Sequence, residues 1–597
     1  MLGVARFGAF FLSIALLCPA AASAEVRIDV PGAADEVTDA VRAASLLVST
    51  EAEDAETVQD LVAAARADYG RLVAVMYERG FFGPEISIRL NRQEAATLSP
   101  FSPPAQITSM EIRVNPGRAF RLGSAEIAPL APDTDLPEGF RSGAPASTPI
   151  LREATEAAIA GWRDDGHAIA GIARQSITAR QREGVLDAQI TVAPGPLIRF
   201  GDLIPEGQDR MRPERIREIA GLPRGEVFSP AAVETSETRL RRTGVFRSVA
   251  LEERPPSADD TMDIGATLVE APLRRFGFGA EVSSTDGAAL STYWLHRNLF
   301  GGAERLRFDA EISGISGDSG GADWELGGAF SRPATINADT TLVFDVTLAG
   351  LDEPNFEETL FEITGGFERI YSDTLTGEIG LGLRYSDITD AFGSRDVTLL
   401  TLPLGLTFDN RDDPLDAREG YFAELALTPF AVLDGSGDGG GLRATLDARG
   451  YLALGQSDRH RLAGRLQLGT VEGGDFTDLP PEFLFFSGGG DTVRGQPYQS
   501  LGALQGGQVA GGRGFLGLSA EYRADITDTY GLVAFVDGGY ISGEALWDDS
   551  GDWQTGAGLG LRYNTALGPI RVDLATPVSG DDAGQSVQLY IGIGHAF

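Results

Sequence analysis

Lysine is missing from this chain of 597 residues, so its 49 basic residues are all arginines, and they stand against 86 acidic residues. Without lysine there is neither the phosphate-binding lysine of a Walker A motif nor an amine for Schiff-base catalysis. The formal net charge of -37 repels nucleic acid. We therefore expect no nucleic-acid partner and no cofactor, and we expect a function other than catalysis.

Cysteine is nearly missing as well, because Cys18 is the single one and falls in a segment typical of a secretory signal peptide. Residues 1–24 contain an arginine, an apolar stretch from Phe7 to Leu17, and the small-residue pattern Ala22-Ser23-Ala24 at the expected cleavage site. Export without cysteine excludes disulfides and cysteine-bound metals in the mature chain. Its stability must then come from sheet pairing and burial.

Long apolar runs are the third absence. No stretch of about 18 apolar residues follows the signal segment, so we expect no transmembrane helix, and a membrane role would require a β-barrel. From about Leu273 onward, apolar and polar residues alternate, as they do from Glu378 to Tyr385. An apolar face backed by arginines and carboxylates suits lipid outside and a polar lumen inside. Residues 272–597 therefore predict an all-β transmembrane barrel of about 16 antiparallel strands.

The first half of the chain mixes strands with helices and repeats itself. The pattern Val114-Asn115-Pro116-Gly117 returns 78 positions later as Val192-Ala193-Pro194-Gly195. Three predicted helix ends share a glycine able to adopt positive φ, at Gly80, Gly166 and Gly244. We predict three α+β units, each with two helices and about three strands, over residues 25–119, 120–197 and 198–271.

Motifs in the second half resemble those of a known superfamily. The glycine-rich segment from Gly488 ends in Val493-Arg494-Gly495, which resembles the Val-Arg-Gly-Tyr signature of the BamA superfamily, with Gln496 in place of the tyrosine. Phe535-Val536-Asp537-Gly538-Gly539 resembles the Phe-x-Asp-x-Gly strand motif of the same superfamily. The segment from Tyr498 to Gly502 is similar to the TamA branch in particular.

The resemblance implies periplasmic POTRA domains followed by a barrel in the bacterial outer membrane. The repeat number favours the TamA branch, because BamA carries five POTRA domains, whereas two-partner secretion transporters carry two and a plugging helix. The resemblance also implies a factor that inserts or secretes autotransporter and other β-barrel clients without nucleotide hydrolysis. Its implied partners are unfolded clients, outer-membrane lipid and a TamB-like protein anchored in the inner membrane.

One predicted site is a loop lock inside the barrel. The resemblance places Val493, Arg494 and Gly495 on an extracellular loop that folds back into the lumen, and alternation places Glu521 and Asp537 on lumen-facing positions. The planar guanidinium of Arg494 is expected to bind both carboxylates through paired, charge-assisted hydrogen bonds. The other interpretation is that Arg494 caps a glycine turn at the surface.

The second predicted site is the seam between the first and the last barrel strand. Glycine weakens strand pairing, so glycines on both sides of the seam favour a lateral gate, with Phe278 expected near Ile591. The residues expected at this gate are Gly277, Gly279, Gly592, Gly594 and Phe597.

Other functions share parts of this pattern. A BamA-like or two-partner-secretion-like translocase would also have the barrel and repeats, a structural tether between the two membranes would not need a mobile seam, and a porin would not need the repeats. Gly317 to Gly321 spells a serine-protease motif, but the histidine context and disulfides of that family are missing. Asp434 to Gly441 is either a calcium-binding loop or, as we expect, a solvated one.

Overall fold

The structure is a computed structural model that describes residues 25–52, 57–99, 101–283, 287–316, 320–435, 439–455, 459–505, 507–545, 550–565, 569–580 and 583–593. The predicted signal segment lies outside these residues, and so do 317–319 of the protease-like motif and 436–438 of the possible calcium loop. The chain divides into two compact units. The first comprises Met1–Phe200, Gly225–Pro230 and Pro256–Thr261, and the second comprises Gly201–Arg224, Ala231–Pro255 and Met262–Phe597.

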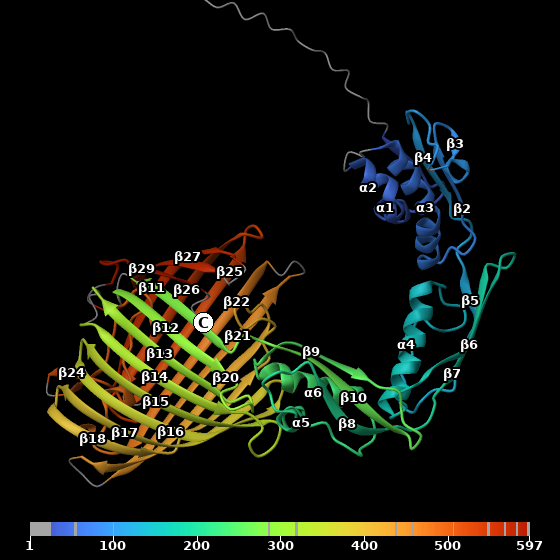
Figure 1. The fold of residues 1–597 in the computed structure, drawn as a ribbon. Helices are drawn as coiled ribbons and strands as arrows, with labels where there is room; N and C mark the ends of the chain where they lie inside the picture. The colour runs from blue at the N-terminus through green and yellow to red at the C-terminus, as the bar shows by residue number, and fades with distance from the viewer. Residues whose placement is uncertain are drawn as a thin grey trace, which may run out of the picture. The chain divides into compact units, whose positions relative to one another are not determined.

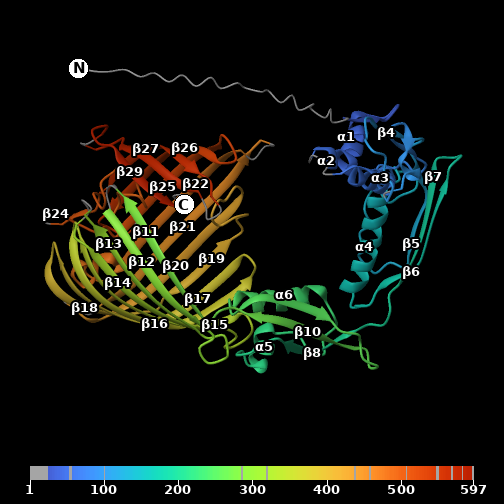
Figure 2. The same cartoon turned by 45° about the horizontal axis from the view of Figure 1, so that its top comes forward.

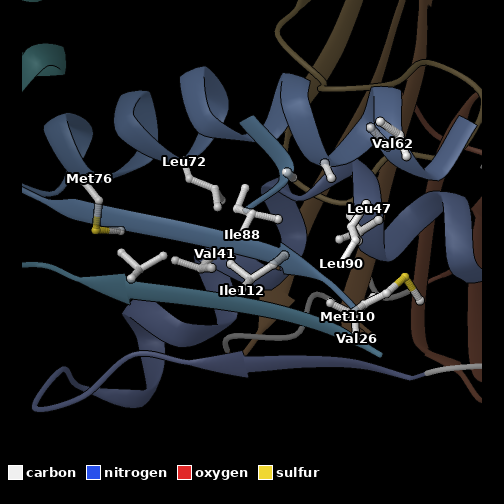
Figure 3. Packing of buried hydrophobic residues seen from close by; sticks show 14 of the residues in the cluster. Val26, Val41, Leu47, Val62, Leu72, Met76, Ile88, Leu90, Met110 and Ile112 are labelled. Carbon is white, nitrogen blue, oxygen red and sulfur yellow. The ribbon is translucent and has the colours of Figure 1, made fainter. Parts of the chain in front are cut away.

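The first domain of the chain is a four-stranded sheet in the order β1-β4-β2-β3, covered by helices. Its elements are β1 (Val26–Asp29), α1 (Asp35–Ala44), α2 (Leu46–Ala52), α3 (Val58–Glu78), β2 (Glu85–Leu90), β3 (Gln93–Glu94), the 3-10 helix η1 (Ala95–Thr97) and β4 (Met110–Asn115). The apolar face of α3 packs Val62, Leu72 and Met76 onto Ile88 and Ile112 of the sheet, and all five are fully buried (Figure 3). Burial of this face, rather than helix propensity, holds the helix on the sheet.

The prediction of two helices is wrong for this domain, because it has three α-helices, with the short α2 lying between α1 and α3. The buried carboxylate of Asp68, on α3, accepts hydrogen bonds from the N–H groups of Leu46 (2.7 Å) and Leu47 (3.1 Å) and from the hydroxyl of Ser45 (2.6 Å). The two N–H groups are backbone donors left without helical partners where α2 begins. The side chain of Asp68 therefore caps α2 as a separate helix.

The second domain has the strand order β5-β7-β6 and one helix where two were predicted. Its elements are β5 (Arg121–Ala128), α4 (Thr148–Asp164), β6 (Gly171–Arg180) and β7 (Val185–Ala193). The segment before α4 contains Pro129, Pro132, Pro137 and Pro145. Proline lacks the backbone donor that a helix interior requires, so this segment forms turns instead.

The third domain has the predicted two helices and three strands. Its sheet has the order β8-β10-β9, and its elements are β8 (Arg199–Glu206), α5 (Pro213–Ala220), α6 (Pro230–Arg242), β9 (Phe246–Glu253) and β10 (Thr261–Glu270). Among the described residues, no helix combines the length and the apolar character needed to cross a membrane.

The prediction of positive φ at the three helix-end glycines is confirmed, with φ of +87° at Gly80, +94° at Gly166 and +65° at Gly244. Two of them also make the same joint to the next domain. The carbonyl of Gly80 accepts the N–H of Phe120, and the carbonyl of Gly166 accepts the N–H of Ile198, both at 2.9 Å. The internal repeat in the sequence therefore corresponds to a repeated connection in the structure.

The rest of the chain forms a closed antiparallel barrel with neighbours in chain order (Figures 1 and 2). Its strands are β11 (Arg274–Ser283), β12 (Gly287–Arg297), β13 (Arg305–Ile315), β14 (Asp323–Arg332), β15 (Thr340–Glu353), β16 (Phe356–Ser372), β17 (Leu375–Asp390), β18 (Gly393–Thr401), β19 (Leu404–Asp409), β20 (Gly420–Asp434), β21 (Gly440–Leu454), β22 (His460–Gly473), β25 (Gly514–Asp525), β26 (Tyr530–Ser542), β27 (Asp552–Tyr563), β28 (Ile570–Pro577) and β29 (Gln588–Ile593).

These 17 strands make 16 crossings, because β18 and β19 are two halves of one strand. Both halves pair with β17 and with β20, and the register with β17 continues unshifted from Thr401 to Leu404. Pro403 lies in the gap, where it cannot donate a ladder hydrogen bond. The predicted strand number is therefore confirmed.

The predicted alternation between lipid and lumen is also confirmed. On β17, Ile379 and Leu381 expose 51% and 56% of their surface, whereas Arg384 exposes 6%. On β25, Leu518 and Tyr522 are exposed, whereas Glu521 is buried. Apolar side chains thus cover the outer wall, and charged side chains line a packed lumen.

Candidate functional site

A long loop between β22 and β25, residues 474–513, fills part of the lumen, and we call it the luminal loop. It contains η2 (Phe476–Asp478), η3 (Pro481–Phe483) and the short hairpin β23 (Ala503–Gln505) and β24 (Gln508–Ala510). Side chains from both ends of the loop contact lumen-facing residues of the barrel strands. The segment with Arg494 therefore lies against lumen-facing residues of the barrel wall.

Arg494 makes the contacts expected of a loop lock. Its Nε and Nη2 donate to the two oxygens of Asp537, at 2.7 and 2.9 Å, and its Nη1 donates to Oε1 of Glu521 at 2.6 Å. Its backbone N–H also donates to Asp537, at 3.2 Å. The arginine is 3% exposed, so it does not cap a surface turn. A planar guanidinium bound by two carboxylates in this way cannot be replaced by an ammonium group without loss of hydrogen bonds.

The structure adds residues that the sequence interpretation missed. Oδ2 of Asp573, on β28, lies 3.5 Å from Nη1 of Arg494, and the ring of Phe535 lies under its guanidinium, 3.6 Å from ring centroid to Cζ. Phe535 precedes Asp537 by two residues on β26, so the strand motif supplies both the carboxylate and the aromatic face. This aromatic contact is a cation–π interaction.

The site is a balanced cluster of charges. Arg523 donates to Glu521 at 2.8 Å, and Arg562 pairs with Asp573. Three arginines thus meet three carboxylates in a part of the lumen where every member is at most 3% exposed. Removing one partner from such a cluster leaves an uncompensated buried charge, which typically costs about 3 to 5 kcal/mol.

The neighbours of Arg494 fix the loop backbone. Val493 is fully buried, and Gly495 has φ of +94° with room for a hydrogen only, because a Cβ there would lie 2.7 Å from the carbonyl of Thr576. Gln496, which replaces the aromatic residue of the superfamily signature, donates from Nε2 to the carbonyls of Thr555 (2.9 Å) and Ser579 (3.1 Å). An amide therefore anchors the loop at the position where the superfamily signature has an aromatic residue.

The predicted seam lies between β11 and β29. In the described part of these strands only two residue pairs join them, Val282 with Ile591 and Ser283 with Tyr590, whereas β11 and β12 share ten pairs. Gly277 and Gly279 lie in β11 and Gly592 lies in β29, but Gly594 and Phe597 fall outside the described residues. The expectation that Phe278 lies near Ile591 is wrong. The register pairs Ile591 with Val282, which is four residues further along β11.

The third domain contacts the barrel at the turn between β14 and β15, within one compact unit. Nε and Nη2 of Arg239, on α6, donate to the two carboxylate oxygens of Asp339 at 2.8 and 2.5 Å. Nη2 of the buried Arg215, on α5, donates to the carbonyl of Pro333 at 2.5 Å. Both acceptors lie in this turn, so an ion pair and a hydrogen bond to a backbone carbonyl join the third domain to the barrel there.

The family follows from comparison with known sequences. A sequence model described as the Omp85 superfamily domain matches residues 298–597, which is half of the chain. The chain belongs to the Omp85 superfamily. A second model, the POTRA model described as surface antigen variable number repeat, matches residues 198–270 of this Omp85 protein.

Individual relatives are distant. The outer membrane protein assembly factor BamA of Nitratidesulfovibrio vulgaris is 22% identical over 436 residues, which cover 70% of this chain and 53% of that protein. The chloroplastic outer envelope protein 80 of Arabidopsis thaliana is 24% identical over 499 residues, which cover 78% and 66%. This Omp85 chain therefore spans between half and two thirds of the length of these relatives.

Solved structures share the fold. The crystal structure of BamA from Haemophilus ducreyi lacking POTRA domains 1-3 superimposes with a TM-score of 0.63 at 16% identity, covering 80% of this chain and all of that one. CdiB from Acinetobacter baumannii superimposes with a TM-score of 0.50 at 12% identity, covering 80% and 90%. The predicted fold class, POTRA followed by an antiparallel barrel, is confirmed, and so is the resemblance at superfamily level. This Omp85 protein is an outer-membrane protein with periplasmic POTRA structure, and its assignment to the TamA branch stays a prediction.

Proposed function

We propose that this Omp85 protein inserts or secretes β-barrel and autotransporter clients at the outer membrane, without nucleotide hydrolysis, through the β11–β29 seam as a lateral gate. The observation that carries the proposal is the contrast in strand pairing. The described part of the seam has two residue pairs, whereas β28 and β29 share six. Where the described part of the seam lacks pairs, the strand edge is available to another strand.

The driving force would come from the client itself. An unfolded client that pairs one strand with the edge of β11 gains main-chain hydrogen bonds, and each further strand can pair with the previous one. The barrel would lower the barrier by supplying the first edge and by thinning the adjacent bilayer. Outer-membrane lipid is therefore a partner of the proposed reaction.

The finer assignment to the TamA branch rests on domain number. Three small α+β sheets precede the barrel, and three is the number of POTRA domains that the resemblance associates with TamA. On this proposal a TamB-like protein of the inner membrane binds the periplasmic domains. Loss of client insertion on removal of a TamB-like partner, with unchanged folding of this barrel, is the expected result for that branch. A BamA-like or two-partner-secretion-like translocase would insert or secrete clients without it.

A disulfide across the seam tests the gate. Val282→Cys and Ile591→Cys are placed in a Cys18→Ser background, because the register makes these two residues direct neighbours. We expect oxidation to stop client insertion into vesicles and reduction to restore it. The matched control is Leu290→Cys with Ile312→Cys, a pair in register between β12 and β13, which should crosslink without affecting insertion.

The serious alternative is a structural tether between the two membranes, which needs no mobile seam. Full client insertion with the Val282–Ile591 crosslink complete, as judged by gel mobility, would refute the lateral gate and favour the tether. Loss of insertion in the β12–β13 control as well would show that any crosslink in the wall inactivates the protein.

A further inference from the structure

The luminal loop is held at a second place, on the wall of the lumen formed by β17 to β22. Its first limb, residues 475–491, receives an arginine from each of four strands. Nη2 of Arg384 donates to Oε2 of Glu482 at 2.5 Å, whereas the other three arginines donate to backbone carbonyls. These three are Arg395 to Thr477 (2.7 Å), Arg443 to Phe483 (3.2 Å) and Arg465 to Asp491 (3.1 Å).

Arg384 is the most deeply buried of the four arginines. It is 6% exposed, and besides Glu482 it donates to Glu358 of β16 at 2.7 Å and to the hydroxyl of Ser386 at 3.2 Å. Glu482 is the loop residue in this group, so it connects the limb to a charge that the barrel wall already holds. The guanidinium of Arg384 is buried, whereas the side chain of Glu482 is 39% exposed. The buried arginine gives the exposed carboxylate of the loop one defined position on the wall, and the charge on both partners strengthens their hydrogen bond.

Apolar packing strengthens the same contact. Leu479, Phe483, Leu484 and Phe485 of the limb pack in one cluster with Phe430 and Val471 of the barrel wall. The guanidinium of Arg443 lies over the ring of Phe485, with Cζ 5.1 Å from the centroid. The first limb is therefore bound by buried rings as well as by charges, whereas the segment around Arg494 is held mainly by ionic contacts to β25, β26 and β28.

We propose that Glu482 and the arginines that bind the first limb are positioning residues, which hold this limb on the wall so that Arg494 is presented to Asp537. The inference rests on the proposed function for its purpose, because a loop fixed at one end can release and rebind its Arg494 end while the seam strands move. The contacts with β17, β18, β21 and β22 supply the fixed end. The contacts of Arg494 supply the end that changes.

A disulfide reporter of loop docking tests this arrangement without a client. A Cβ at Gly539, on β26, would lie 3.3 Å from Cβ of Ser487, close to the separation of about 3.5 to 4.5 Å found across disulfides. In a Cys18→Ser background, Ser487→Cys with Gly539→Cys should crosslink rapidly under mild oxidation. The yield at a fixed short time then measures how well the limb is positioned next to β26.

Glu482→Gln should lower this yield by at least about fivefold, the loss expected when a charge-assisted hydrogen bond is replaced by a neutral one. Glu482→Asp keeps the charge and should recover at least half of the yield. The matched control is Asp491→Asn, because Arg465 binds the backbone carbonyl of Asp491, which this substitution retains. Heat-modifiable mobility on a gel shows that each barrel is folded.

An unchanged yield in folded Glu482→Gln would overturn the proposal, and so would equal losses in Glu482→Gln and Asp491→Asn. If Glu482→Gln does not fold, Arg465→Gln replaces it in the test, because it removes the contact with Asp491 at the far end of the limb. An unchanged yield in folded Arg465→Gln, or a loss equal to that of Asp491→Asn, would then overturn the proposal. Because the crosslink is measured without clients, its failure does not depend on the seam, and failure of the seam test does not affect it.

Discussion

The hydroxyl of Tyr590 accepts a hydrogen bond from the backbone N–H of Gly495 at 3.1 Å, so the last described barrel strand is tied to the luminal loop directly after Arg494. Tyr590 is 3% exposed, and its register partner across the seam is Ser283. One residue thus belongs to both predicted sites. Movement of β29 at the seam would therefore strain or break the hydrogen bond to Gly495 next to the loop lock. Release of the lock would in turn remove this hydrogen bond from β29.

Tyr590→Phe removes the hydroxyl that accepts the N–H of Gly495 and keeps the ring. We expect the loop segment 490–500 to exchange its amide hydrogens about fivefold to tenfold faster, as loss of one hydrogen bond of about 1 kcal/mol implies. The matched control is Tyr540→Phe, since the hydroxyl of Tyr540 accepts the N–H of Gly551 at the same distance of 3.1 Å. Equal exchange in segment 490–500 for both variants, followed by mass spectrometry, would contradict the connection.

Arg494→Ala should impair client insertion at least about tenfold, because it leaves Glu521 and Asp537 buried without their shared partner. Arg494→Lys should recover only part of the loss, since an ammonium cannot bind two carboxylates as a fork does. The variants are compared by insertion of a radiolabelled barrel client into vesicles that contain the protein.

The control for Arg494 must be a buried luminal arginine outside the cluster. Arg562 is unsuitable, because it pairs with Asp573, which Arg494 also approaches. Arg461, on β22, is 2% exposed and pairs with Asp416 at 2.9 Å. If Arg461→Ala reduces insertion as much as Arg494→Ala does, the effect belongs to the lumen in general and not to the loop.

Strand alternation predicted most of the barrel and the positions of Glu521 and Asp537, because lipid and lumen impose a period of two on every strand. It could not find Asp573 or Tyr590 as partners of the loop, since alternation says which face a residue occupies and not which strand the loop reaches. The seam register failed for a similar reason. The pairing of Phe278 with Ile591 rested on an assumed register between the first and the last strand. That register depends on the lengths of the strands and loops, which alternation does not give.

Gly123→Ala should destabilise the second domain by about 1 to 2 kcal/mol. The N–H of Ser124 donates to Asp187 at 2.9 Å, and a Cβ at Gly123 would overlap the same carboxylate. Gly70→Ala is the control, because Gly70 lies inside α3 with nothing within 4 Å of the added carbon, and alanine there should stabilise the helix by about 0.5 to 1 kcal/mol. Urea-dependent hydrogen exchange of each domain measures the change in its free energy of unfolding. If Gly123→Ala and Gly70→Ala change that free energy in the same direction, the crowding at Gly123 does not explain the effect.

Acid should loosen the contact between the third domain and the barrel. Hydrogen bonds from Arg239, together with the nearby charge of Arg242, hold the pKa of Asp339 below its ordinary value, against the opposing effect of burial. A lowered pKa means that the carboxylate stabilises the contact fully above the ordinary value of about 4, and that this stabilisation is lost as the pH falls through the pKa in the folded protein.

Between pH 7 and about 5, proteolysis of the segment between α5 and α6 should therefore stay constant, and it should accelerate below pH 4. Asp339→Asn should give the fast rate at pH 7, whereas Asp373→Asn, in the exposed turn between β16 and β17, should not. A pH-independent rate in the unmodified protein together with a normal rate in Asp339→Asn would mean that Arg215 and its backbone acceptors hold the domain without the ion pair.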